Sequence, residues 1–351
     1  MNIHSCMVLH APNIHTGGGF VLLRAFVAAW PTDMKFSALL DARAQGYVLL
    51  PDGAKVTWVN PTLVSRLGAE LHLRAIAKSN DVILCFHGLP PLFVKQPRVV
   101  VFLQNRLYLA RKLAPGYTLK TWFRLTSERF ISRMFRRRVS QYIVQTPSMQ
   151  RAVLRWYGER DPKKPMVRVL PFFEAFDAVS GPIVTRPEWD FLYVADGEAH
   201  KNHRKLIAAW RLLAQDGLRP SLALTLSSRD GALKREVVAL ADEENLRIKD
   251  LGQMRHDEVL CLYAQAGALI FPSTSESLGL PLIEAVHAGL PILAAELDYV
   301  RDVCDPVQTF DPTSPVSIAR AVKRFLSVPE PVLQLRSPRD FWRELLSKAS
   351  E

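Results

Sequence analysis

The stretch FPSTSESLGLPLIEAVHAG, residues 271–289, predicts a strand that ends at Phe271, a polar loop and a helix. Proline is favoured at the first position of a helix, so we expect this helix to begin at Pro281. Gly289 has the backbone freedom that the residue after a helix commonly needs. The free N–H groups and partial positive charge at such a helix start suit a phosphate. The stretch therefore predicts a strand–loop–helix unit with an anion-binding loop.

The same alternation of strand-like and helix-like segments continues along the whole chain, which is typical of parallel sheets covered by helices. The strands predicted in the first half are Ser5–Leu9, Lys35–Leu40, Lys55–Val59, Val82–Phe86, Val99–Leu103 and Gln141–Val144. Those in the second half are Phe191–Val194, Ala223–Leu226, Arg247–Leu251, Ala268–Phe271 and Pro291–Ala295. We therefore expect an α/β protein with two Rossmann-like, doubly wound domains.

The length of 351 residues allows two domains of ordinary size. A polar segment that contains proline, Glu174–Asp190, is the predicted linker. The first domain is predicted to span residues 1–175 and the second residues 190–330. Residues 331–351 contain a predicted helix, Arg339–Ser350, which we expect to pack back on the first domain.

The composition points to a cytoplasmic protein. No apolar run reaches the roughly 20 residues that a membrane-spanning helix needs, and Met1–Leu9 lacks the basic start of a signal peptide. The four cysteines are scattered, so we expect neither a disulfide framework nor a zinc site.

Basic charge is concentrated in one segment, Arg106–Arg138. It holds ten basic residues and one acidic residue, and its +9 accounts for most of the formal net charge of +11. Apolar residues fall largely on one helical face between the basic ones: Leu119, Trp122, Phe123, Phe130, Ile131, Met134 and Phe135. This pattern predicts an interfacial helix that faces anionic lipid. A helix packed on the core with a solvated basic face is the alternative. Nucleic acid is not expected, because no aromatic platform or helix-turn-helix pattern accompanies the charge.

Two glutamates in the opening stretch carry the chemistry. Glu284, expected in the first turn of the helix, can accept hydrogen bonds from a vicinal diol such as that of a ribose. Glu276, on the preceding loop, is placed to face a sugar beyond the phosphates. The alternatives are a glutamate that only stabilises the helix dipole and a solvated loop acid.

The pair Glu276 and Glu284 forms an E-x7-E pattern inside SESLGLPLIEA, which resembles the donor-site signature of the family 4 (group 1) retaining glycosyltransferases of GT-B fold. Three further segments resemble that family: Leu251-Gly252 followed by Leu262-Tyr263-Ala264, then Phe310-Asp311-Pro312, and Val169-Leu170-Pro171. The resemblance implies two domains that face each other across a cleft. It places the donor in the second domain and the acceptor in the first.

The resemblance also implies roles for single residues in the donor site. Lys201 and Asn202 match the end of a family motif that holds the pyrophosphate, and Asn202 is in addition a predicted helix N-cap. The family's arginine position is Asp196 in this chain, so Arg204 or Lys205 is expected to compensate. Glu276 and Lys201 are the predicted catalytic residues. The remaining predicted donor contacts are Glu284, Ser277, Leu278, Gly279, Gly18 and Gly19.

In the first domain, Gly18 and Gly19 lie in TGGGF, residues 16–20, where glycine lets the backbone approach a phosphate or a sugar. A tight turn between strand and helix explains the cluster nearly as well. His87, Gln104 and Asn105 follow predicted strands and are the expected acceptor contacts. Gln104 replaces a histidine that many relatives carry, so a histidine base is not expected there.

No Asp-x-Asp motif occurs in the sequence, so we expect transfer without a metal and without a cofactor. The resemblance implies a glycosyltransferase that moves a sugar with retention from a nucleotide-diphosphate sugar to a glycan or polyprenyl-diphosphate-linked acceptor. Surface polysaccharide or lipopolysaccharide synthesis at the inner face of the plasma membrane is the expected setting. The alternatives are a sugar-nucleotide 2-epimerase and a non-catalytic protein that binds lipid or nucleic acid.

Overall fold

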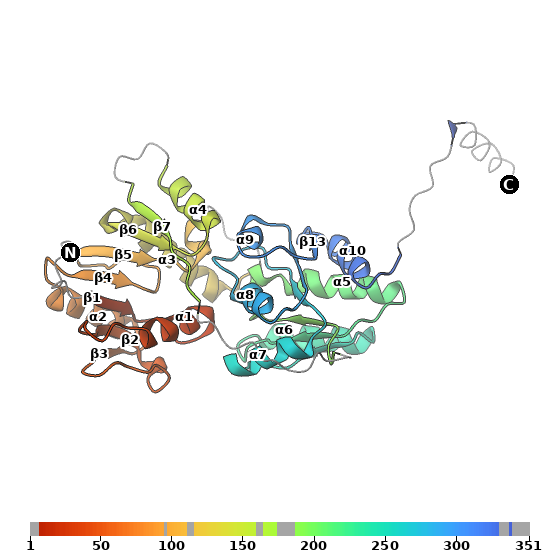
Figure 1. Ribbon diagram of the computed structural model, residues 1–351, viewed down its shortest axis with the longest axis horizontal. Coiled ribbons are helices and arrows are strands. Elements are labelled where there is room, and N and C mark those ends of the chain that lie inside the picture. The colour runs from red at the N-terminus through yellow and green to blue at the C-terminus, as the bar shows by residue number, and fades with distance from the viewer. Residues whose placement is uncertain are drawn as a thin grey trace.

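The structure is a computed structural model that describes residues 7–94, 97–110, 116–158, 164–173, 187–329 and 337–338. It contains two parallel sheets, one in residues up to 173 (the first half) and one from residue 187 onward (the second half). Figure 1 shows the two halves side by side, each with helices packed around its sheet.

The first sheet has seven strands in the order β3-β2-β1-β4-β5-β6-β7, all parallel. Its strands are β1 (Met7–Ala11), β2 (Ser37–Asp41), β3 (Lys55–Val59), β4 (Val82–Cys85), β5 (Arg98–Phe102), β6 (Gln141–Val144) and β7 (Met166–Val169). Its α-helices are α1 (Gly17–Ala28), α2 (Leu63–Ile76), α3 (Leu119–Phe135) and α4 (Pro147–Tyr157). The short 3₁₀ turns are η1 (Ala42–Ala44), η2 (Arg106–Leu109) and η3 (Arg136–Arg138). The order reverses between β1 and β4, and a crevice at the carboxyl ends of the strands is expected at such a point.

The second sheet has six parallel strands in the order β10-β9-β8-β11-β12-β13. They are β8 (Phe191–Tyr193), β9 (Leu222–Leu224), β10 (Ile248–Asp250), β11 (Leu269–Phe271), β12 (Ile292–Ala295) and β13 (Gln308–Phe310). The helical segments are η4 (Ala199–Lys201), α5 (His203–Gln215), α6 (Gly231–Glu243), α7 (His256–Gln265), α8 (Leu280–His287), α9 (Asp298–Arg301) and α10 (Pro315–Phe325). Here the order reverses between β8 and β11, so the loops after these two strands lie next to each other.

Burial explains why the sheets form as they do. Strands β8, β9, β11 and β12 consist of apolar side chains that are almost completely buried, as expected for parallel strands covered on both faces. Leu278 and Leu280, from the loop and helix after β11, are buried in a core cluster of the first half, together with Phe86 and Phe102. The loop after β11 and the start of α8 therefore pack against the first half.

The predicted fold class is confirmed, because both halves are doubly wound parallel sheets. Every predicted strand is present, with ends shifted by a few residues. Two strands, β7 and β13, are additional to those listed from the sequence, although the quoted Val169-Leu170-Pro171 segment marks the end of β7. Most of the predicted linker and the whole predicted helix Arg339–Ser350 lie outside the described residues. The domain boundaries stay predictions.

Among the residues that the structure describes, no helix combines the length and the apolar character that crossing a membrane requires.

Candidate functional site

The centre of the candidate site is an ion pair between Lys201 and Glu276. Lys201 ends η4 after β8, and Glu276 lies on the loop after β11, so the reversal of strand order brings them together. Lys201 Nζ lies 2.7 Å from Glu276 Oε1. Ser273 Oγ donates a second hydrogen bond, of 2.6 Å, to the same oxygen. Two predicted catalytic residues are therefore in direct contact.

Both members of this pair are ionised at neutral pH. Burial alone would lower the pKa of Lys201, but the neighbouring Glu276 and Asp196 carboxylates raise it above its ordinary value. Burial would likewise raise the pKa of Glu276, but the Lys201 charge and the bonds from Lys201 and Ser273 lower it. The site therefore holds a fixed positive charge beside a fixed carboxylate.

Asn202 holds the loops of this site together in a way that differs from the prediction. It stands at the N-cap position of α5 but makes no capping bond there, and its φ of 65° lies in the left-handed region. Its side-chain Nδ2 donates instead to Pro272 O at 3.1 Å and Pro312 O at 2.7 Å. The predicted cap is wrong, because the amide joins the loops after β11 and β13.

Glu284 lies on α8 and is almost completely buried. Its Oε1 lies 2.8 Å from His256 Nε2, and its Oε2 accepts a 2.7 Å hydrogen bond from Tyr263 Oη. Both partners belong to α7. Helix α8 begins at Leu280, one residue before the predicted start, so Glu284 is its fifth residue and lies just beyond the first turn.

The loop from Glu276 to α8 contacts the first half of the chain. Thr146 Oγ1, after β6, donates to Ser277 O at 3.1 Å, and the Leu278 side chain is buried against the first half. Gly279 has a φ of +77°, which favours glycine, and forms the N-cap of α8. Leu278, predicted as a donor contact, therefore serves to pack the two halves together.

The glycine cluster of the first half forms the first turn of α1 instead of a loop before it, and it contacts α8. A Cβ added at Gly18 would lie 2.9 Å from Leu280 Cδ1, and one added at Gly19 would lie 3.1 Å from Gln104 Oε1. The absence of side chains at these positions makes room for Leu280 and Gln104. Close approach of the backbone was predicted, but in this structure the approaching groups are protein side chains.

The two basic residues expected to compensate for Asp196 lie on the first turns of α5. Arg204 forms a two-pronged ion pair with Glu236 of α6, with a shortest N–O distance of 2.9 Å, and both side chains are exposed to solvent. Lys205 is exposed as well. The prediction that Arg204 compensates for Asp196 gains no support from this placement.

The three predicted acceptor contacts lie near the carboxyl ends of β4 and β5. His87 Nδ1 lies 3.0 Å from His10 O, and burial lowers the pKa of His87 to about 4, so the ring is neutral. Because a carbonyl only accepts, Nδ1 donates and Nε2 is left as an acceptor. Gln104 Nε2 donates to Phe86 O at 2.7 Å, and Asn105 Oδ1 accepts from Leu107 N at 3.0 Å.

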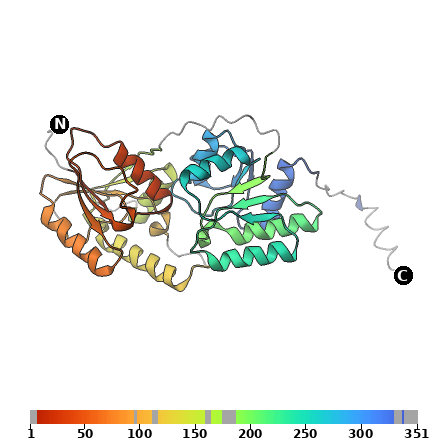
Figure 2. The same ribbon diagram turned by 90° about the horizontal axis from the view of Figure 1, so that it is seen from below.

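A contact between the halves connects η4 to the start of the basic helix α3. Tyr117 Oη lies 3.2 Å from His200 Nδ1, and Arg124 Nη2 lies 3.5 Å from Glu198 Oε1. Figure 2 shows α3 on the outside of the first half, with one end close to the second half. The residue next to Lys201 is thus linked to the most basic segment of the chain.

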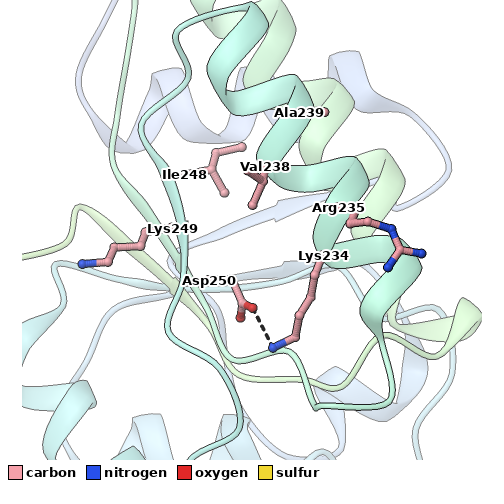
Figure 3. A pocket seen from close by; sticks show the side chains of 7 residues that line it. All are labelled: Lys234, Arg235, Val238, Ala239, Ile248, Lys249 and Asp250. Carbon is pink, nitrogen blue, oxygen red and sulfur yellow. Dashed lines mark ion pairs between the residues drawn. The ribbon is translucent and has the colours of Figure 1, made fainter.

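A shallow, open pocket of about 520 Å³ lies elsewhere, between α6 and the edge strand β10. Figure 3 shows its lining, which includes an ion pair of 2.9 Å between Lys234 and Asp250. None of the predicted site residues lines this pocket. Within the described part of the chain, no group of three or more His, Cys, Asp or Glu side chains is arranged to hold a metal ion.

Several residues of the site were not singled out from the sequence: Ser273, Thr146, His200 and His256. Tyr263 belongs to a segment that resembles the family, but the sequence assigns no role to it. The place of Tyr263 in that segment was the one sequence signal that could have identified a further site residue. The contacts of the other four residues depend on how the loops fold.

Part of the chain is similar to known glycosyl transferases. Residues 183–337 match a family model described as glycosyl transferases group 1. The serotype-specific mannosyltransferase WbdA of Escherichia coli is 28% identical over 159 residues, which are 43% of this chain and 19% of that protein. The O-antigen chain mannosyltransferase B of Escherichia coli is 31% identical over 115 residues, 32% of this chain and 30% of that protein. The chain thus spans less than one third of the length of either relative.

Among solved structures, Anabaena Alr3699/HepE in complex with UDP and glucose superposes with a TM-score of 0.62. The match covers 92% of this chain and 90% of that one at 16% sequence identity. The chain has the GT-B fold. In this chain the loop after β11, at the switch point of the second sheet, contacts the first half, and the same switch point holds Lys201 and Glu276.

Proposed function

We propose that this chain is a glycosyltransferase that moves a hexose from a nucleotide-diphosphate sugar to a glycan acceptor in the synthesis of a surface polysaccharide or lipopolysaccharide. The observation that carries the proposal is the ionised Lys201–Glu276 pair at the switch point of the second sheet. The match of residues 183–337 to group 1 glycosyl transferases includes both residues, and the two mannosyltransferases named above support the class of sugar.

In this proposal the diphosphate lies between Lys201 and the N-terminus of α8. Its negative charge grows as the bond to the sugar breaks, and Lys201 Nζ and the helix N–H groups stabilise that charge. Glu276 orients the donor sugar and holds Lys201 in place. The leaving phosphate accepts the proton of the acceptor hydroxyl on the same face, so the product keeps the anomeric configuration of the donor.

Transfer is expected to be independent of divalent metal, because Lys201 and α8 supply the positive charge that a metal would supply. The rate with saturating donor should stay within about twofold after treatment with EDTA. One donor fixed beside a developing negative charge is worth about 10²–10³-fold in rate in other enzymes, or about 2.7–4 kcal/mol, so Lys201 can supply an effect of this size without a metal. The rate is measured as nucleotide release. Loss of activity that magnesium or manganese restores would contradict this prediction.

Glu284 is proposed to accept hydrogen bonds from the ribose of the donor. Replacing Glu284 by alanine should weaken nucleotide binding by about 1.5–3 kcal/mol, the usual value of hydrogen bonds to a charged group. Calorimetry with the released nucleotide measures this loss directly. An unchanged affinity in the folded variant would remove Glu284 from the donor site.

The acceptor is proposed to be linked to lipid, and the α3 surface supports this. Five large apolar side chains of α3 are exposed: Leu119, Trp122, Phe123, Phe130 and Met134. Exposed basic residues lie among them and just beyond the helix: Lys120, Arg124, Arg133 and Arg137. Exposed aromatic residues beside bases suit the interface of an anionic membrane. We call these nine residues the α3 surface.

The decisive assay supplies nucleotide sugars, including a nucleotide-linked mannose, with and without a lipid-linked glycan acceptor. A glycosyltransferase releases nucleotide and labels the acceptor in equal amounts, and release depends on the acceptor. Release without acceptor, together with an epimerised sugar, would instead favour the 2-epimerase.

A further inference from the structure

The carboxylate of Glu284 is held at both of its oxygens by side chains of α7. His256 Nε2 reaches Oε1 at 2.8 Å, and Tyr263 Oη reaches Oε2 at 2.7 Å. Glu284 and Tyr263 are buried, whereas 30% of the His256 side chain remains exposed. The cluster therefore extends from the core to the surface, and His256 is its outermost member.

The positions of the two partners follow from α7. His256 is the first residue of this helix and Tyr263 is seven residues later, so both side chains lie on one face, two turns apart. Helix α7 thus presents one imidazole and one phenol to α8. Both contacts fix the Glu284 side chain, because a carboxylate held at each oxygen cannot change rotamer without breaking a bond.

The donors and acceptors can be assigned. A carboxylate only accepts, so Tyr263 donates its hydroxyl hydrogen, and His256 donates from Nε2. Each carboxylate oxygen has two lone pairs, and each has one left after these bonds. A vicinal diol offers two O–H donors, so two acceptors held in a fixed orientation match it.

We propose that His256 and Tyr263 are positioning residues that orient Glu284 toward a ribose diol, and that His256 thereby sets the preference for ribonucleotides over 2′-deoxyribonucleotides. This inference rests on the proposed donor site. It adds to that site a determinant of which nucleotide is accepted.

A purely structural role would have a different signature. Tyr263 and His256 could serve only to satisfy a buried carboxylate, which is costly to bury without hydrogen bonds. Their removal would then lower stability and weaken all nucleotides equally. Orientation of Glu284 instead predicts a loss that depends on whether the 2′-hydroxyl is present.

The test is calorimetry with UDP and GDP and their 2′-deoxy forms, using whichever base binds wild type more tightly. The wild type should prefer the ribonucleotide by about tenfold, the value of one hydrogen bond to a charged group. In His256→Ala the ribonucleotide should bind about fivefold more weakly and the 2′-deoxy form as before, so the preference falls to about twofold. His256→Gln, whose amide can donate to Oε1, should recover most of the preference.

Tyr263→Phe removes only a hydroxyl and should also reduce the preference. Cys261→Ala, an exposed position on the same helix, is the matched control and should behave as wild type. A preference that persists in His256→Ala, or an equal loss for both forms, would overturn the inference while leaving the donor site intact. If wild type binds none of the four nucleotides, this inference fails, whereas the proposed function fails only if acceptor-dependent nucleotide release is absent as well.

Discussion

Replacing Lys201 by alanine is expected to lower kcat by about 10²- to 10³-fold, the effect of removing one preorganised donor from a developing oxyanion. The reason is geometric. Lys201 Nζ is fixed 2.7 Å from Glu276, so its charge is in place before the leaving group forms. The loss should appear mainly in kcat, because the diphosphate carries more negative charge after the bond breaks than before. Nucleotide release at saturating donor measures it.

The same substitution also removes the counter-charge of Glu276. Loss of one partner from a largely buried ion pair should lower the free energy of unfolding by up to about 3 kcal/mol. This value is the low end of the range for buried pairs, because both side chains keep some exposure to solvent. Activity must therefore be measured well below the melting temperature. Arg211→Ala, which breaks an exposed ion pair between α5 and Glu244 at the end of α6, is the matched control and should keep wild-type kcat. A Lys201→Ala enzyme with unchanged kcat would contradict the assigned role.

Reversing three charges of the α3 surface, with Lys120→Glu, Arg133→Glu and Arg137→Glu together, is expected to abolish sedimentation with phosphatidylglycerol vesicles. Each basic residue at an anionic surface contributes about 1 kcal/mol, so losing three and adding repulsion should weaken binding by at least about 100-fold. Binding of wild type should fall steeply as salt is raised, because the interaction is screened within a Debye length. Calorimetric nucleotide binding should be unchanged.

The choice of residues comes from the structure. Arg136 donates to Trp156 O and Arg138 to Pro91 O and Leu92 O, so these two arginines are bound to the body of the first half. Reversing them would test stability as well as docking. Three reversals at exposed bases elsewhere, Arg24, Arg235 and Lys249, form the control with equal net charge.

Equal sedimentation of wild type with neutral phosphatidylcholine would indicate insertion of the apolar side chains alone. Failure to bind either lipid, together with tight and salt-sensitive binding of RNA, would overturn the membrane prediction and favour a nucleic-acid partner.

The sequence was sufficient to predict the fold, and it pointed to the residues that form the centre of the candidate site. Alternating apolar runs are a local signal, and in a parallel sheet they define the strands almost directly. The E-x7-E spacing placed Glu276 on a loop and Glu284 on a helix, because a single strand–loop–helix unit contains both. Only the family resemblance could assign Lys201 to the same site, because Lys201 and Glu276 are 75 positions apart in the sequence.

The contacts that sequence reasoning missed are long-range ones. Asparagine is a residue type that favours an N-cap, yet the Asn202 amide donates to carbonyls of the loops after β11 and β13 instead. The sequence predicts Leu278 as part of a loop that contacts the ligand, but its side chain is buried against the first half. His256 carries no local signal at all, because its role depends on how α7 packs against α8. The local sequence does not predict such contacts, because it does not show whether a side chain bonds to a neighbour or to a residue far away in the chain.

The donor site proposed at Lys201, Glu276 and Glu284 is tested most directly by a thermal-shift measurement with a panel of nucleotides and nucleotide sugars. A ligand at 100 times its Kd should stabilise the protein by about 2.7 kcal/mol, an easily measured rise in melting temperature. We predict that one nucleotide and its sugar conjugates raise the melting temperature of wild type, and that Glu284→Ala loses most of this rise. No rise with any member of the panel, or an equal rise with inorganic phosphate alone, would contradict a donor site at these residues.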